Sequence, residues 1–404
     1  MECNKEQKEA IMHRDGPAMV LAGPGAGKTY VITNRVKALI DEYGVKPEQI
    51  LVVTFSKAAA VEMKERFEML TGGRRLPVRF GTFHSVFFQI LRLAYHYEVK
   101  DIATPALKYR FLEETFNETG YEVDDKKEFL SDIEKEISRV KGEGIEIDCY
   151  FSSACSAEIF QKMYRGYQEK LQRHRCLDFD DMVVYTYQLL KEREDIRRRW
   201  QAQFRYLLID EFQDINHLQY DIVRMLAKPR DNLFIVGDDD QSIYHFRGAK
   251  PEIMLNFTKD YPKAETVLLD INYRCTKNVL QAAMNVVGCN QIRFKKRLST
   301  PNEQGKPVKV MEFDNPREEY VKIAAFLKKR LEAGENLEDT AVLFRTNQEA
   351  EGLVGALMEY QIPFTMKEQL PNLFRHWISR NLMAYLKMAA GDRTRKLFLE
   401  IMNR

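Results

Sequence analysis

The sequence has no long apolar run. No stretch approaches the roughly 18 consecutive apolar residues of a membrane-spanning helix, and the first residues, MECNKEQKEA, are too polar for a secretory signal. We therefore expect a cytoplasmic protein without a membrane partner. The six cysteines form no CxxC pair and no zinc-finger spacing, which is typical of free thiols in a reducing compartment.

A dominant charge of one sign is also absent. Lys and Arg number 62 against 60 Asp and Glu, which leaves a formal net charge of +2. No global field therefore attracts a polyanion, and any nucleic-acid surface must be local. With 404 residues, of which 45% are hydrophobic and 30% charged, the chain has the composition of a globular protein with two to four domains.

Short apolar, β-branched runs alternate with helical patterns along much of the chain. Such runs are typical of strands buried on both faces, and their alternation with helices predicts an α/β fold with a parallel sheet. Residues 86–199 interrupt the alternation with charged, amphipathic helical patterns, which predict an all-helical insertion. The expected strands are 18–22, 50–55, 205–210, 233–238, 266–271, 308–313 and 340–346.

The stretch LAGPGAGKT, residues 21–29, follows the first predicted strand and precedes a helical pattern. Glycines let backbone N–H groups wrap a β-phosphate, and the helix N-terminus adds its positive end. Lys28 would reach the β- and γ-phosphate oxygens, and the Thr29 hydroxyl would bind Mg²⁺. Ala22 stands at the usual first glycine of this motif. The predicted phosphate loop contains Gly23, Gly25, Ala26, Gly27, Lys28 and Thr29.

An acidic pair ends another predicted strand, in LLIDEFQD at residues 207–214. Ligands of open α/β sheets lie at the carboxyl ends of the strands. Asp210 would hold Mg²⁺, directly or through water, and Glu211 would polarise the attacking water. The alternative is a solvated acidic helix cap, which the phosphate loop in the same chain disfavours.

Residues 236–248, VGDDDQSIYHFRG, combine two chemistries. The carboxylates and Gln241 suit a phosphate or metal site, whereas the aromatics suit stacking on nucleobases. The alternative for Tyr244 and Phe246 is a place in the hydrophobic core.

The ordered motifs resemble those of superfamily 1 DNA helicases of the UvrD/Rep/PcrA type, across nearly the whole chain. This resemblance implies RecA-like P-loop NTPase domains with parallel sheets, and ATP with Mg²⁺ as cofactors. The motifs are NKEQ (4–7), AGPGAGKT (22–29), TFSKAAAVEMKER (54–66), GTFHS (81–85), LDFDDM (177–182), LIDEFQDIN (208–216), VGDDDQSIYHFRGA (236–249), INYRC (271–275) and AVLFRTN (341–347).

The resemblance also implies roles around the nucleotide. Gln241 would sense the γ-phosphate, and Arg274 would act as an arginine finger. Gln7 would read the adenine edge, which favours ATP over GTP. Tyr273 would pack on adenine, and Tyr30 stands where relatives often carry Arg, so two tyrosines could sandwich the base.

Contacts to single-stranded DNA are implied in the same way. Tyr244 and Phe246 would stack on bases of any sequence, although the family usually has Trp at the position of Phe246. Phe55 and His84 match DNA contacts at the ends of their strands, and Asn347 matches a contact to the DNA backbone. The family's TFTNKAA is TFSKAAA here, which changes the contacts near Phe55.

The resemblance divides the chain into domains. Residues 1–85 and 200–275 would form the first RecA-like domain, 86–199 its helical insertion, and 276–388 part of a second RecA-like domain. Residues 389–404 would begin a truncated inserted domain, because no later motif of the family precedes Arg404. We therefore expect an incomplete portion of a motor, with ATP binding but little DNA-stimulated hydrolysis and no unwinding by itself.

The expected function is that of an ATP-dependent translocase and helicase with 3′→5′ polarity, acting on single-stranded DNA and tailed duplexes. Two alternatives stay open. One is a protein that binds ATP and DNA without unwinding. The other is a P-loop enzyme that acts on RNA or on the substrate of a nuclease partner.

Overall fold

The computed structural model describes residues 3–244, 248–367 and 377–402, without the side chains of Asn347, Gln348, Trp377, Lys396 and Glu400. Two predicted DNA contacts, Phe246 and the side chain of Asn347, thus lie outside the described residues. The chain divides into two compact units, Met1–Val308 and Lys309–Arg404.

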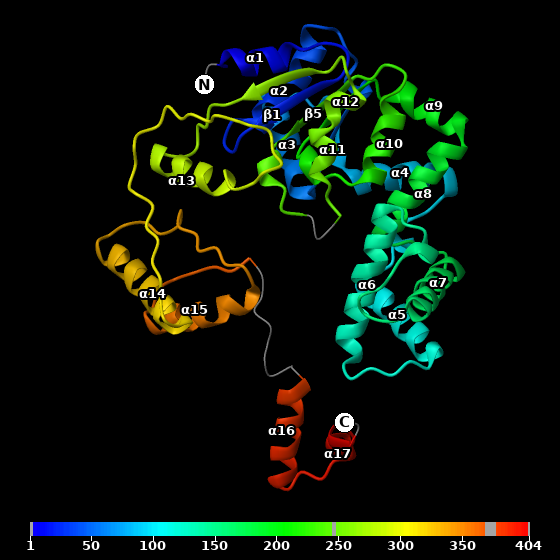
Figure 1. The fold of residues 1–404 in the computed structure, drawn as a ribbon, viewed down its shortest axis with the longest axis vertical. Helices are drawn as coiled ribbons and strands as arrows, with labels where there is room; N and C mark the ends of the chain where they lie inside the picture. The colour runs from blue at the N-terminus through cyan, green and yellow to red at the C-terminus, as the bar shows by residue number, and fades with distance from the viewer. Residues whose placement is uncertain (1–2, 245–247, 368–376, 403–404) are drawn as a thin grey trace. The chain divides into compact units, whose positions relative to one another are not determined.

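The first unit is built on a six-stranded sheet with the order β3-β2-β4-β5-β1-β6 (Figure 1). Every pair of neighbouring strands is parallel. Val20, the middle residue of β1, lies opposite Val236 of β5 and Val267 of β6. The strands are β1 (Ala18–Ala22), β2 (Ile50–Thr54), β3 (Arg79–Thr82), β4 (Tyr206–Ile209), β5 (Leu233–Gly237) and β6 (Glu265–Leu269). The predicted α/β fold with a parallel sheet is confirmed.

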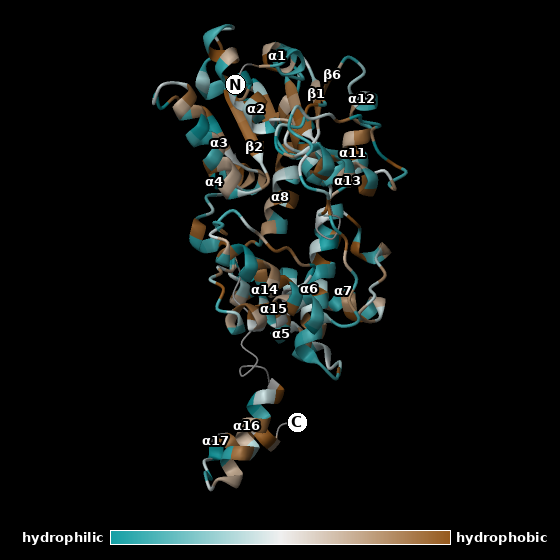
Figure 2. Ribbon diagram, turned by 90° about the vertical axis from the view of Figure 1, so that its left-hand side faces the viewer, coloured by the Kyte–Doolittle hydropathy of each residue, from teal (hydrophilic) through white to brown (hydrophobic). Residues whose placement is uncertain are grey.

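Alternate residues of β1 enter two different cores, one on each face of the sheet. Met19 and Leu21 pack toward α4, α8 and α10, whereas Val20 packs toward α1, α2 and α3. Figure 2 shows the hydrophobic strands β1 and β2 in brown between these helices. The helices against the sheet are α1 (Lys5–Met12), α2 (Lys28–Asp41), α3 (Lys57–Leu70), α4 (Phe83–Tyr95), α8 (Phe179–Glu192), α9 (Glu194–Gln203), α10 (His217–Ala227), α11 (Pro251–Leu255) and α12 (Phe257–Asp260).

The segment 86–199 is helical, and the structure describes all of it. Its only β feature is an isolated bridge between Ile102 and Leu177. Three of its helices, α5 (Pro105–Thr119), α6 (Lys126–Glu143) and α7 (Ala157–Arg173), enclose a core of their own. The segment is helical, as predicted, but only α5, α6 and α7 have a core separate from the sheet, because α4, α8 and α9 pack against the sheet. Short 3₁₀ turns are η1 (Pro47–Gln49), η2 (Val99–Asp101), η3 (Ile147–Cys149), η4 (Phe212–Asp214) and η5 (Asp239–Gln241).

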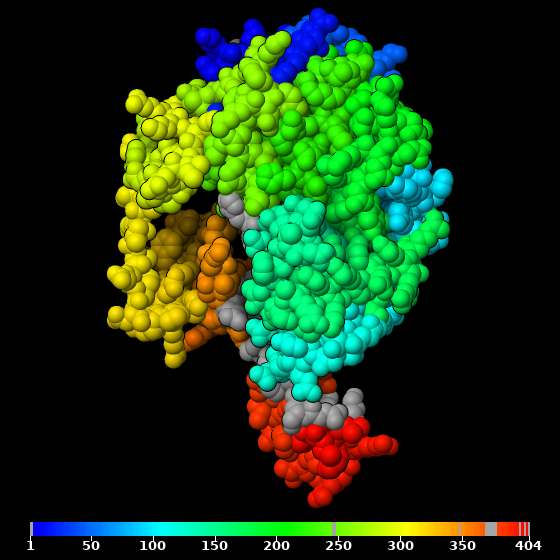
Figure 3. Space-filling view, turned by 45° about the vertical axis from the view of Figure 1, so that its right-hand side comes forward, coloured from blue at the N-terminus to red at the C-terminus, as the bar shows by residue number. Residues whose placement is uncertain are grey.

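The residues after β6 stay with the first unit. α13 (Lys277–Val287) and the segment that follows it lie on the body of the sheet domain, in yellow-green and yellow in Figure 3. Asn302 donates to the backbone oxygens of Tyr273 and Cys275 at 3.2 and 3.0 Å. The first compact unit ends at Val308, and the domain boundary near residue 276 stays a prediction.

The second unit contains helices but no strand among its described residues. α14 (Pro316–Glu332) and α15 (Asn347–Glu359) share a small core around Ala324 and Leu353, and α16 (Trp377–Ala389) packs on α17 (Arg395–Met402). The strands predicted at 308–313 and 340–346 are therefore wrong for this structure.

The reason for this correction is physical. A strand needs a neighbour to satisfy its backbone N–H and C=O groups, and these two segments have none among the described residues of the second unit. Val310 and Leu343 accordingly remain 93% and 92% exposed. Across the described chain, no helix combines the length and the apolarity that a membrane crossing requires.

Candidate functional site

The predicted phosphate loop joins β1 to α2 in a conformation that glycine permits. Gly25 and Gly27 have φ of 67° and 89°, in the left-handed region that other residues rarely adopt. A Cβ on Gly25 would lie 2.7 Å from Cβ of Arg274. α2 begins at Lys28 without a side-chain cap on its first turn. A glycine loop leading into an uncapped helix N-terminus is a favourable site for phosphate.

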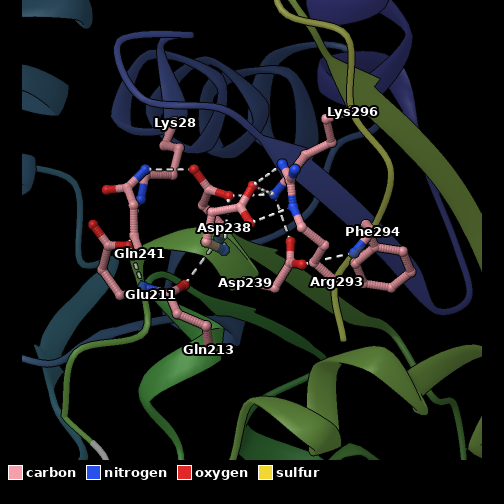
Figure 4. Close-up of polar contacts among 10 residues, drawn as sticks. Lys28, Glu211, Gln213, Asp238, Asp239, Gln241, Arg293, Phe294 and Lys296 are labelled. Atoms are coloured by element: carbon pink, nitrogen blue, oxygen red, sulfur yellow. Dashed lines mark hydrogen bonds and ion pairs between the residues drawn. The ribbon is translucent and has the colours of Figure 1, made fainter. Parts of the chain in front are cut away.

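The acidic pair lies beside this loop, at the carboxyl end of β4. Glu211 forms an ion pair with the ammonium of Lys28, and it accepts a hydrogen bond of 3.0 Å from Nε2 of Gln213 (Figure 4). Glu211 has φ of 49°, a strained value for a residue with a side chain, and such strain is typical of functional sites. The structure therefore places two of the predicted catalytic residues, Lys28 and Glu211, in direct contact.

Asp210 is suited to a cation. Its carboxylate is buried, and Oδ1 has no hydrogen-bond partner among the described residues. Burial, together with the charge of Glu211, raises the pKa of Asp210 to about 7. A buried carboxylate oxygen without a partner is costly unless a ligand or water completes it. Asp210 and Thr29 line one cavity, so the chemistry of these oxygens fits the predicted Mg²⁺ site.

That cavity has a volume of about 390 Å³ and joins the two predicted halves of the site. Its walls include the predicted nucleotide residues Thr29, Asp210, Glu211 and Gln241. They also include two predicted DNA contacts, Phe55 and Tyr244. The stretch 238–244 thus brings an amide near the nucleotide residues and an aromatic ring near the DNA residues of one cavity.

Gln213 and Asp214 line the same cavity, although the sequence predicts no role for them. Gln213 Nε2 lies 3.3 Å from Oδ2 of Asp214, and Gln213 Oε1 accepts a hydrogen bond of 3.0 Å from the backbone N–H of Asp238. Burial and the charge of Glu211 raise the pKa of Asp214 to about 6. The only signal in the sequence is their position in the turn after the acidic pair.

The predicted adenine residues lie beside the phosphate loop. Gln7 is buried, and its Nε2 donates to the backbone oxygen of Ala26 at 3.0 Å. The N–H of Tyr273 donates to the backbone oxygen of Gly25 at 3.1 Å. Tyr30 is half-buried in the first turn of α2. Gln7 and Tyr273, far apart in the sequence, therefore meet at one loop.

The arginine finger predicted at Arg274 is exposed beside the phosphate loop, with its Cβ near Gly25. Asn272 holds this turn in place, because its Oδ1 accepts from the N–H of Arg274 at 2.8 Å and its Nδ2 donates to the oxygen of Pro24 at 2.6 Å. Asn272 is buried. No pattern in the sequence distinguishes it as an anchor.

The predicted DNA contacts follow the carboxyl ends of β2, β3 and β5. The rings of Phe55 and Tyr244 stack, with centroids 5.5 Å apart and an interplanar angle of 19°. His84 meets the edge of Phe179 with centroids 5.4 Å apart, and burial lowers the pKa of His84. Phe179 is 55% exposed and begins α8, so it is a further aromatic at this surface that the sequence did not single out.

Comparisons with known proteins agree with this arrangement. The model of the UvrD/REP helicase N-terminal domain matches residues 3–262, and that of the UvrD-like helicase C-terminal domain matches residues 267–404. YjcD of Bacillus subtilis (strain 168) is 37% identical over 398 residues, which cover 96% of this chain and 52% of YjcD. The ATP-dependent DNA helicase PcrA of Staphylococcus epidermidis is 34% identical over 404 residues, which cover 96% of this chain and 54% of PcrA. The chain spans about half the length of the curated relatives it matches.

Proposed function

We propose, since the chain belongs to the UvrD/REP helicase family, that it couples ATP hydrolysis to movement on single-stranded DNA and to strand separation. The names of relatives such as PcrA, an ATP-dependent DNA helicase, support this proposal. The observation that carries it is the single cavity lined by Thr29, Asp210, Gln241, Phe55 and Tyr244.

At the nucleotide, Lys28 would bind the β- and γ-phosphates, and Gln7 and Tyr273 would hold the adenine. Mg²⁺ bound by Thr29 and Asp210 would neutralise charge on the phosphates. Lys28 now pairs with Glu211, and phosphate oxygens would compete for its ammonium. Glu211, still held by Gln213, could then accept a proton from the attacking water, while Arg274 would stabilise charge on the transferring phosphoryl group.

At the DNA, the aromatic residues would stack on bases without reading sequence. Stacking of one base on an aromatic side chain contributes about 1–3 kcal/mol and tolerates every base. In the described structure Phe55 and Tyr244 stack on each other, so a base that enters between them must replace that contact. Gln241 and Tyr244 are three residues apart, and a shift of Gln241 toward a γ-phosphate would move the ring as well.

Binding experiments test the two ligands together. A labelled single-stranded DNA, followed by fluorescence anisotropy, should bind with an affinity that falls with salt and is indifferent to sequence. A non-hydrolysable ATP analogue should change that affinity. Competition with RNA of the same length should be weak, and equal competition would favour the alternative of an RNA-directed enzyme.

Strand displacement tests the finer proposal of 3′→5′ polarity. A duplex with a 3′ single-stranded tail should be unwound and one with a 5′ tail should not. The matched variant Glu211→Gln should keep its ATP affinity but lose hydrolysis by about a thousandfold, because an amide keeps the shape but accepts no proton. Displacement from the 5′ tail would overturn the polarity. Binding of ATP and DNA with no displacement from either tail would leave binding without unwinding as the function.

A further inference from the structure

A segment after α13 crosses the nucleotide side of the first unit and contacts several predicted motifs. This segment, residues 293–302, is called the strap below. At one end Arg293 and Lys296 contact the acidic stretch 238–240. In the middle, Leu298 approaches the phosphate loop so closely that a Cβ on Gly23 would lie 2.7 Å from it. At the other end Asn302 donates to the backbone of Tyr273.

Lys296 lies at the centre of a charged cluster. Its side chain is only 1% exposed, and its ammonium contacts Asp238, Asp239 at 2.5 Å and Asp240 at 2.9 Å (Figure 4). Arg293 binds Asp240 through two nitrogens at 2.7 and 2.6 Å. The three carboxylates lie close enough together to hold a metal ion, but the ammonium of Lys296 already contacts each of them. A buried ammonium is tolerated because it is paired and hydrogen-bonded.

The cluster continues into the candidate site through Asp238. One carboxylate oxygen of Asp238 accepts from Lys296, and the other accepts from Nε2 of Gln241 at 2.6 Å. The N–H of Asp238 donates to Gln213, which in turn donates to Glu211. The strap is thus connected by side chains to the residue predicted to sense the γ-phosphate.

We propose that Lys296 is a positioning residue that orients the amide of Gln241 through Asp238 and thereby sets the preference for ATP over ADP. The inference rests on the role proposed above for Gln241. Asp238 is fully buried, so its carboxylate needs a paired cation to hold one orientation beside two other carboxylates. Without Lys296, repulsion from Asp239 and Asp240 turns the carboxylate of Asp238 away from Gln241. The amide of Gln241 then loses its hydrogen-bond acceptor.

The test measures dissociation constants of Mg·ATP and Mg·ADP by calorimetry for the 404-residue chain and its variants. Lys296→Met removes the charge with little change in length. It should weaken ATP binding about tenfold, the effect of one lost hydrogen bond to a charged group, and change ADP binding less than about twofold. Lys296→Arg keeps the charge and should recover most of the preference.

Arg293→Gln is the matched control. It removes a positive charge from the same cluster, but Arg293 hydrogen-bonds Asp240 and not the carboxylate that holds Gln241. Its ratio of ATP to ADP affinity should equal that of the parent. A parallel loss of ATP and ADP affinity in Lys296→Met, or an unchanged ratio, would overturn the proposal, because either result means a structural role only.

Two further variants keep the test decisive. If Lys296→Met does not fold, Asp238→Asn replaces it: Lys296 keeps Asp239 and Asp240, but one amide oxygen cannot serve both Lys296 and Gln241, so the ratio should still fall. Gln241→Ala separates this inference from the proposed function. A lower ratio in Gln241→Ala with a normal ratio in the Lys296 and Asp238 variants would sink only the inference. If the unsubstituted chain binds Mg·ATP no more tightly than Mg·ADP, both the proposed role of Gln241 and this inference are wrong.

Discussion

Two segments of similar composition occupy opposite environments in this chain. LFIVG at 233–237 forms β5, fully buried between β1 and β4. AVLFR at 341–345 has the same apolar character, yet it forms no strand, and Leu343 is 92% exposed. The difference lies in the neighbours, because β5 receives backbone hydrogen bonds on both edges. An apolar β-branched run becomes a strand only where other strands offer an edge.

The same contrast applies to the candidate site. Parallel strands end on one edge of a sheet, so residues that follow β1, β2, β4 and β5 meet there although the sequence separates them widely. Thr29, Phe55, Glu211 and Gln241 line one cavity for this reason. In the second unit no sheet is present among the described residues, and the motif that ends at Asn347 has no such edge to join.

A matched pair of substitutions tests this comparison, with the largest effect we expect. Leu233→Asp places a charge at a fully buried position of β5 and should lower the free energy of unfolding by more than about 5 kcal/mol. Leu343→Asp, at an exposed position, should change it by less than about 0.5 kcal/mol. Urea unfolding followed by circular dichroism measures both. Equal destabilisation would mean that 341–345 is buried in solution.

The next effect concerns the nucleotide and should be confined to the first unit. Lys28→Ala removes the one side-chain cation of the phosphate loop and should weaken Mg·ATP binding about a hundredfold, equivalent to about two charged hydrogen bonds. Lys37→Ala changes a half-buried lysine of the same helix, paired with Asp41, and should leave affinity unchanged. Calorimetric titration compares the three proteins. Equal ATP affinity in Lys28→Ala and the parent would contradict the phosphate-loop assignment.

These contrasts also explain what the sequence could predict. The phosphate loop is local, because its strand end, glycines and helix start are contiguous. All three can be predicted from residues 21–29 alone. The apolar strand pattern at 308–313 is equally clear, but the prediction from it is wrong. A strand forms only if another strand, distant in the sequence, pairs with its backbone. β3 is absent from the strands predicted by apolar pattern for the opposite reason: its four residues, RFGT, include only one that is buried. Only the resemblance implies a strand end before His84.

The role of Lys296 is the least visible from sequence. It lies between Lys295 and Arg297, which are both exposed, and its partners are more than fifty residues away. Only the folded chain distinguishes the buried ammonium from its two exposed neighbours. Gln213 and Asn272 are similar, because their amides become functional candidates through contacts with other motifs.

A smaller effect is expected at the DNA side of the cavity. Phe55→Ala removes one ring of the stack with Tyr244 and should weaken binding of single-stranded DNA about tenfold, within the range for loss of one base-stacking aromatic. ATP affinity without DNA should stay the same. Phe326→Ala, an exposed aromatic of the second unit, is the control and should change neither. If ATP and DNA affinity fall together in Phe55→Ala, the ring is structural.

The smallest expected effect is a pH dependence of Mg·ATP affinity that comes from the carboxylate of Asp210. Burial and the charge of Glu211 raise the pKa of Asp210 to about 7, and Mg²⁺ requires the ionised form. As pH falls through 7, a proton competes for the site, so Mg·ATP affinity should fall about fourfold between pH 8 and pH 6.5. Above pH 8 the affinity should be nearly constant, because Asp210 is then ionised before the cation binds.

The control for this prediction is Asp210→Asn, because ATP itself takes up protons in the same range. The asparagine binds Mg²⁺ more weakly but does not titrate, so whatever pH dependence remains in this variant belongs to the nucleotide. The difference between the two profiles, measured by calorimetry at fixed free Mg²⁺, isolates the proton on Asp210. Identical profiles for Asp210→Asn and the parent would show that Asp210 is already ionised at pH 6.5, and that Lys28 and any bound water offset its burial.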